Sequence, residues 1–110
     1  MTVAEVASAL ELKVFTGEVA LTNNVACGYA GDLLSDVMSH CKDGSAWLTI
    51  QTHQNIIAVA VLTGVSAVII CGGRVPETDT LARAQRENIP VLGSDKCLYE
   101  TVGKVYNLLV

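Results

Sequence analysis

The segment VSAVII, residues 65–70, constrains the fold more than any other part of the chain. It joins apolar and small residues over a length that is typical of a buried strand. Two glycines at positions 72 and 73 follow it, and such a pair predicts a turn. The segment therefore predicts one buried strand, around which the other elements have to be arranged.

The apolar run IIAVAVL, residues 56–62, is harder to interpret, because apolar runs occur in both buried strands and buried helices. One interpretation is a hairpin to residues 65–70. The other is a helix, which we favour because Thr52 and Asn55 supply capping side chains and Gly64 is typical of a Schellman ending. A helix that is apolar all round has to be covered on both faces, so we expect it between the sheet and a partner subunit.

The rest of the chain alternates between strand and helix patterns. Thr2 and Glu5 have the spacing of a capping box, and Asp32 is expected to cap the second helix. Signals between residues 18 and 31 are mixed, and we expect a short strand over 18–21. The other expected elements are strands over 12–15, 46–50 and 90–92 and helices over 2–10, 32–40, 76–87 and 96–108.

This succession of strands and helices predicts right-handed crossovers and a largely parallel sheet. A chain of 110 residues is expected to form one domain, here over residues 1–110. We therefore predict a three-layer α/β/α fold.

Charged residues are scarce in this sequence. They make up 16% of the chain, against ~25% in typical soluble domains, while 51% of the residues are hydrophobic. Part of the outer surface is therefore expected to be apolar, and a large apolar patch usually marks an interface. We expect a homo-oligomer.

Charge and hydropathy exclude several classes of partner. The net charge is −4 and the basic residues are scattered, so we expect neither nucleic acid nor acidic lipid as a partner. No window reaches the ~18 apolar residues of a membrane span. The first residues lack the basic region of a signal peptide, so we expect a cytoplasmic protein.

The four cysteines are far apart in the sequence and show no CxxC spacing. We expect ordinary buried thiols in a reducing compartment, and neither a metal nor a cofactor. An iron–sulfur or zinc site, with ligands gathered from across the fold, stays open as an alternative. The residues concerned are Cys27, Cys41, Cys71 and Cys97.

A cluster of polar side chains separates the strand over 46–50 from the apolar helix. It consists of Gln51, Thr52, His53 and Gln54, followed by Asn55. Ligands of open α/β sheets bind outside the carboxyl ends of the strands, where this cluster is expected to lie. We therefore expect the four residues 51–54 to contact a ligand. The alternatives are capping for Thr52 and a solvated loop histidine for His53.

Two further loops are expected at the same edge of the sheet. Gly72, Gly73 and Arg74 follow the strand over 65–70, and Ser94 follows the strand over 90–92. The N-termini of helices bind anions, and a guanidinium binds phosphate or carboxylate through two parallel hydrogen bonds. We expect all four residues to bind an anionic ligand. A tight turn, an exposed arginine and a helix cap are the alternatives.

Catalytic motifs are missing from the sequence. It contains no GxxxxGK[ST] phosphate loop, no GxSxG elbow and no HExxH helix. The expected crevice holds few acidic residues, which argues against a magnesium-dependent phosphotransferase. We expect no catalytic residues and no enzymatic activity.

The stretches GYAGDLLSDVM, THQNIIAVAVLTGVSAVIICGGRVPETDTLARAQRENIPVL and GSDKCLYETVGKV resemble the DRTGG domain over residues 28–106. In that family a strand ends in Asp-Arg-Thr, an apolar helix follows, and a second strand ends in Gly-Gly. Gly72 and Gly73 match this pattern. Thr52, His53 and Gln54 stand where the family name has Asp-Arg-Thr.

The resemblance is strongest to stand-alone DRTGG proteins of anaerobic bacteria, which are often encoded beside iron-only hydrogenase genes. Related domains in regulated pyrophosphatases, phosphate acetyltransferases and HPr kinase look like regulatory and dimerising modules. The resemblance implies an α/β fold like that at the front of HPr kinase, a homodimer and a non-enzymatic regulatory role.

The sequence is consistent with three functions. The first is a homodimeric regulatory module that binds a small nucleotide or phosphorylated metabolite, with adenine nucleotides as one candidate class. The second is a ligand-free interaction protein that docks on a hydrogenase component or another redox enzyme. The third is an iron–sulfur protein.

Overall fold

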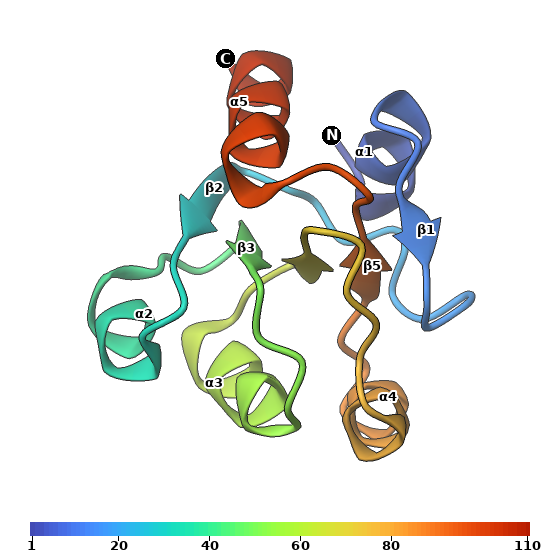
Figure 1. Ribbon diagram of the computed structural model, residues 1–110, viewed down its shortest axis with the longest axis vertical. Helices are drawn as coiled ribbons and strands as arrows, with labels where there is room; N and C mark the ends of the chain where they lie inside the picture. The colour runs from blue at the N-terminus through green and yellow to red at the C-terminus, as the bar shows by residue number, and fades with distance from the viewer.

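The computed structural model describes residues 1–110 as one five-stranded sheet between two layers of helices (Figure 1). The predicted three-layer α/β/α fold is confirmed. The strands are β1 (Lys13–Val14), β2 (Cys27–Ala30), β3 (Ser45–Thr49), β4 (Ala67–Ile70) and β5 (Val91–Gly93). The helices are α1 (Val3–Ala9), α2 (Leu34–His40), α3 (Asn55–Thr63), α4 (Thr78–Arg86) and α5 (Leu98–Leu109).

The strand order is β1-β5-β4-β3-β2, so β1 and β2 are the edges of the sheet. Strands β2 to β5 are parallel, and only β1 runs antiparallel, against β5. The carboxyl ends of four strands therefore meet at one edge of the sheet. Because β1 runs the other way, its first residue, Lys13, also lies at this edge, opposite Gly93.

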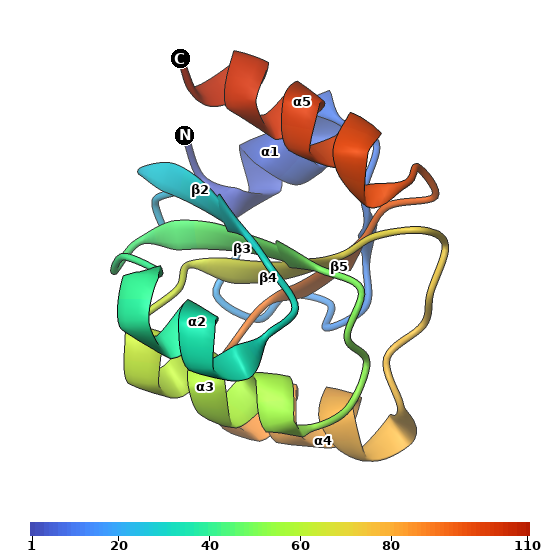
Figure 2. The ribbon, with the colours of Figure 1, turned by 60° about the vertical axis from the view of Figure 1, so that its left-hand side comes forward.

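The two faces of the sheet carry separate hydrophobic clusters. One face packs against α2, α3 and α4, and the other against α1 and α5 (Figures 1 and 2). Neighbouring residues of a strand point to opposite faces, so Trp47 joins the first cluster and Leu48 the second. In β4, Val68 and Ile69 divide in the same way, and both are fully buried. Because both faces of these strands are buried, their sequences are continuous apolar runs without alternating polar residues.

The apolar run after the polar cluster is a helix, α3, as expected, and the hairpin alternative is wrong. Helix α3 ends at Gly64, which has a left-handed backbone with φ 73°. The N–H groups of Gly64 and Val65 both donate to the carbonyl of Ala60, at 3.0 and 3.3 Å. Not all of α3 is covered, because Leu62 is 76% exposed at its last turn.

The segment between α1 and β2 differs from the prediction. Residues 18–21 form turns rather than a strand, because the carbonyl of Leu21 accepts a hydrogen bond from Ala4 at the start of α1. The true edge strand, β2, was not predicted, since Gly28 and its alanine neighbours have low β-propensity. It forms through parallel pairing with β3.

The capping box at Thr2 and Glu5 is confirmed. The expected cap at Asp32 is wrong, because Leu33 occupies the N-cap position of α2 and makes no side-chain cap bond. None of the five helices combines the length and the apolar composition that a membrane crossing requires.

Two glycine-to-alanine substitutions are expected to have opposite effects on the free energy of unfolding. At Gly64 the left-handed backbone makes alanine unfavourable by about 1–2 kcal/mol. At Gly103, inside α5, an added Cβ meets no atom within 4 Å, and alanine should stabilise by about 0.5–1 kcal/mol. Urea unfolding measures both values. A Gly64→Ala variant that is as stable as the wild type would contradict this account of the α3 ending.

Candidate functional site

The polar cluster at residues 51–55 lies at the carboxyl edge of the sheet, directly after β3. Asp32 ties this loop to the end of β2. Its carboxylate accepts hydrogen bonds from the Thr49 hydroxyl at 2.6 Å and from the Ile50 N–H at 2.9 Å. The Gln51 side-chain amide donates to the Asp32 carbonyl at 3.0 Å. Asp32 therefore bonds the end of β3 rather than the start of α2.

The N-terminus of α3 is capped in a way that the sequence pattern did not predict. The N-cap residue is Gln54, which makes no side-chain cap bond, so the expected capping by Thr52 and Asn55 is wrong. Instead Nδ1 of His53 accepts a hydrogen bond from the Asn55 N–H at 3.1 Å. His53 is exposed, and one of its ring nitrogens is thus committed to the backbone.

Thr52 connects the cluster to the next helix. Its carbonyl accepts a hydrogen bond from the buried Thr80 hydroxyl at 2.7 Å and another from the Glu77 N–H at 3.2 Å. The β3–α3 loop therefore fixes the first turn of α4. Since residues 71–77 join β4 to α4, this contact also holds one end of the segment that carries Arg74.

The glycine pair after β4 forms a turn with positive φ angles that contacts the neighbouring loop. Gly72 and Gly73 have φ angles of 80° and 70°, a region that glycine adopts readily. Their N–H groups donate to the carbonyls of Lys96 and Ser94, at 2.7 and 2.9 Å. Both donors are therefore used to join the loops after β4 and β5.

Ser94 is buried and its hydroxyl is also engaged. The hydroxyl lies 2.8 Å from that of Thr101 and accepts a hydrogen bond from the Lys96 N–H at 3.2 Å. Ser94 thus fixes the loop between β5 and α5.

A cavity of about 30 Å³ brings together three of the predicted residues and five that were not predicted. The loop after β4 contributes Gly73, Arg74 and Val75, and the end of β5 with its following loop contributes Gly93, Ser94 and Asp95. Lys13 and Phe15 line it from β1 and the residue that follows. Gly93 allows this approach, because a Cβ there would lie 2.5 Å from the Phe15 ring. Residues 51–54 do not line this cavity.

A second cavity, of about 270 Å³, shares Ser94 with the first. It lies between α1 and its following turn on one side and α5 on the other. Lys96 and Lys104 line it, together with Glu11. The two adjacent cavities therefore carry Lys13, Arg74, Lys96 and Lys104, which are four of the seven Lys and Arg residues in the chain.

These four cations have no ion-pair partner in the chain. The single ion pair of the molecule joins His40 and Asp36, at 3.1 Å on α2, at the other side of the sheet. Glu11 and Asp95 line the same two cavities, so four cations against two acids leave a local excess of positive charge, even though the net charge is −4.

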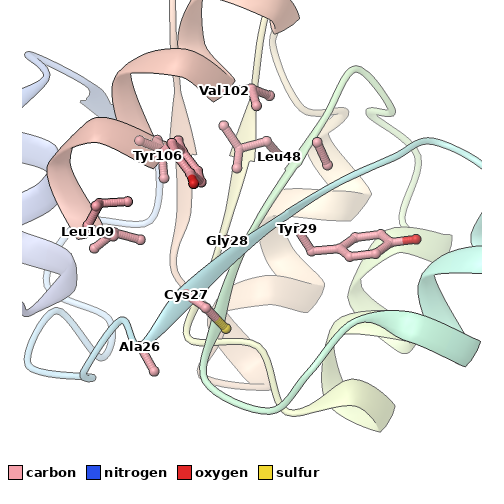
Figure 3. Close-up of a pocket in the computed structure, with 11 residues that line it drawn as sticks. Ala26, Cys27, Gly28, Tyr29, Leu48, Val102, Tyr106 and Leu109 are labelled. Carbon is pink, nitrogen blue, oxygen red and sulfur yellow. The ribbon is translucent and has the colours of Figure 1, made fainter.

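A third cavity, of about 280 Å³, is chemically different (Figure 3). It lies between the edge strand β2 and α5, and ten of its eleven lining residues are hydrophobic. No cation lines it, so it is unsuited to an anion.

The cysteines are less buried than expected. Cys71 is buried, Cys27 and Cys41 are half-buried, and Cys97 is exposed. Burial raises the pKa of the Cys71 thiol, which disfavours the reactive thiolate. No group of three His, Cys, Asp or Glu side chains is placed to hold a metal ion.

Removing the Asp32 carboxylate should destabilise the carboxyl edge. In Asp32→Ala the fully buried Thr49 hydroxyl loses its acceptor, and the free energy of unfolding should fall by about 1–3 kcal/mol. Asp95→Ala is the control, because this exposed side chain makes no hydrogen bond, and it should change stability by less than about 0.5 kcal/mol. Equal unfolding curves for the two variants would contradict the anchoring role of Asp32.

Comparisons with known proteins identify the family of the chain and a solved structure of similar fold. The model of the DRTGG domain matches residues 5–108. A solved structure with the same fold contains the CBS and DRTGG domains of the regulatory region of Clostridium perfringens pyrophosphatase, complexed with its activator, diadenosine tetraphosphate. The TM-score is 0.69 at 13% identity, over 94% of this chain and 45% of that chain. No curated protein matches the sequence.

Proposed function

The chain belongs to the DRTGG domain family, and from this premise we propose that it is a non-enzymatic, homodimeric regulatory module that binds a small anionic ligand. Adenine nucleotides are the first class to test. The pyrophosphatase region with the same fold was solved with a dinucleotide activator, which supports this choice.

One observation carries the proposal: Lys13 and Arg74 line the same small cavity and neither has an ion-pair partner. The two residues are far apart in the sequence and are brought together by the fold. An unpaired guanidinium and an unpaired ammonium on one cavity form a site for phosphate, since arginine binds it through a planar fork and lysine as a point charge.

The size of the two cavities suggests how a nucleotide would lie. About 30 Å³ beside Arg74 takes no more than part of one phosphate group. The adjoining cavity of about 270 Å³ extends the site past Ser94 towards Lys96 and Lys104. We propose that a phosphate binds at Lys13 and Arg74 and that the rest of the ligand occupies the larger cavity.

The residues predicted from the sequence take different roles in this proposal. Arg74 contacts the ligand, while Gly73 and Ser94 shape the wall, because their polar groups already bond within the protein. Gly72 lies outside the cavity and holds the loop after β5 through its bond to the Lys96 carbonyl. Gln51, Thr52, His53 and Gln54 would support the site from outside it. Their loop holds the start of α4 and thereby the segment that carries Arg74.

A second candidate function is docking on another protein, such as a hydrogenase component or a different redox enzyme. The exposed apolar side chains of Val61 and Leu62 at the end of α3 favour it. On this alternative the cationic corner has no ligand, and loss of its charges leaves the behaviour of the protein unchanged.

Ligand binding is tested by thermal unfolding with AMP, ADP, ATP, diadenosine tetraphosphate and pyrophosphate. A ligand at 100 times its dissociation constant adds about 2.7 kcal/mol, which raises the melting temperature by roughly ten degrees or more. Lys13→Ala and Arg74→Ala should each weaken binding by about tenfold or more, because each removes one charged contact. Arg86→Ala, an exposed arginine on α4, is the matched control.

Two results would contradict the anion site. One is the absence of any shift across the panel at millimolar ligand. The other is an equal shift in wild type, Lys13→Ala and Arg74→Ala.

A further inference from the structure

The two edges of the sheet differ in how they are protected. Strand β1 has only two paired residues and carries the exposed Lys13. Strand β2 pairs with β3 on one side only, and residues 26–31 contain neither a charged residue nor a proline. Monomeric proteins block their edge strands with short length, lysine, proline or a covering element. The β1 edge is blocked in this way, and the β2 edge is open.

The surface around β2 is apolar where it meets α5. Ala26, Gly28 and Ala30 have small side chains or none, and a cavity of about 280 Å³ remains between them and α5 (Figure 3). Two large side chains lie at its rim and face solvent, Tyr106 at 68% and Val110 at 88% exposure. An open strand edge beside an uncovered apolar groove is typical of a surface that accepts another strand.

The charged residues of α2 and of the loop after it, which lie beside β2, favour a second copy of the chain as that partner. Near the amino end of the strand, Cys27, His40 and Lys42 line one small cavity. Further along the strand, the Tyr29 hydroxyl donates a hydrogen bond to the carboxylate of Asp36. The His40 ring lies 3.1 Å from this carboxylate, so the basic end of the strand is marked by Lys42 alone and the acidic end by Asp36.

Asp36 is held in its charged form. The Tyr29 hydroxyl, and after it the His40 ring, lower the pKa of the Asp36 carboxyl below its ordinary value. Lys42, in contrast, has no ion-pair partner within the chain. Antiparallel pairing of two β2 strands places the basic end of each copy beside the acidic end of the other. Parallel pairing would place like charges together.

We propose that two copies of this chain pair their β2 strands antiparallel about a two-fold axis, so that two five-stranded sheets become one continuous sheet. This specifies the interface of the homodimer proposed above and rests on that proposal. Helix α5 lies over β2, so the two α5 helices meet on one face and cover the groove. The two α2 helices meet on the other face, where Lys42 of each copy pairs with Asp36 of its partner.

The experiment is sedimentation equilibrium of the full chain at several concentrations. The wild type should have twice the 11.6 kDa mass of one chain. Ala30→Lys places two lysines on the paired strands and should raise the dimer dissociation constant by about 100-fold or more. Ala82→Lys, which adds the same charge at an exposed alanine of α4, should leave the dimer unchanged. Far-UV circular dichroism checks that each variant is folded.

A second variant tests the charge pairing without touching the strand. Lys42→Glu should weaken the dimer by about tenfold, and Arg86→Glu, the same reversal on α4, should not weaken it. A monomeric wild type would overturn both the homodimer and this interface. Equal dimer dissociation constants for wild type, Ala30→Lys and Lys42→Glu would overturn the β2 interface alone. The chain would then form its homodimer through a different surface.

Discussion

Burial of β3 and β4 on both faces is the constraint on which the rest of the structure depends. A strand with no solvent-facing side requires helices above and below it, and the short connections of this chain meet that requirement with parallel crossovers. The carboxyl ends of parallel strands all lie at the same edge of the sheet. Every loop that leaves β2, β3, β4 or β5 is therefore brought to the same edge, where polar side chains and helix N-termini gather.

Most of the polar groups at that edge bond to one another. Asp32 holds the end of β3, Thr52 holds the start of α4, and the glycine turn at 72–73 bonds the loop after β5. Arg74, Lys13 and Asp95 take no part in these bonds and line the small cavity beside them, and the Lys13 ammonium lies 5.7 Å from the centre of the Phe15 ring. The polar cluster that is most conspicuous in the sequence is on this account the framework of the site, and the ligand contacts lie one loop further along the sheet.

The sequence predicted those features that depend on burial. The run at 65–70 was predicted as a buried strand from its apolar composition and length. The run at 56–62 fitted a strand as well, and the helix was favoured on its flanking residues, of which Gly64 has the expected left-handed backbone. The sequence-based prediction was wrong or incomplete where a residue bonds to, or lies beside, a residue that is distant in the sequence. Asp32 looked like a helix cap, and only the fold brings Thr49 to its carboxylate. Lys13 was not predicted as a site residue, because its place beside Arg74 follows from the antiparallel pairing of β1 with β5. Strand β2 was missed because its glycine and alanines carry no strand pattern, although they leave the groove under α5.

The central claim is that an anion binds at the corner formed by β1 and the loops after β4 and β5. Amide chemical shifts in a ¹H–¹⁵N NMR titration with ATP and with inorganic pyrophosphate test it most directly. The account predicts that both ligands shift the amides around Lys13, Arg74 and Lys96, and that ATP also shifts those lining the cavity beside α1. Shifts centred on the apolar groove between β2 and α5, or no shifts at millimolar ligand, would contradict it.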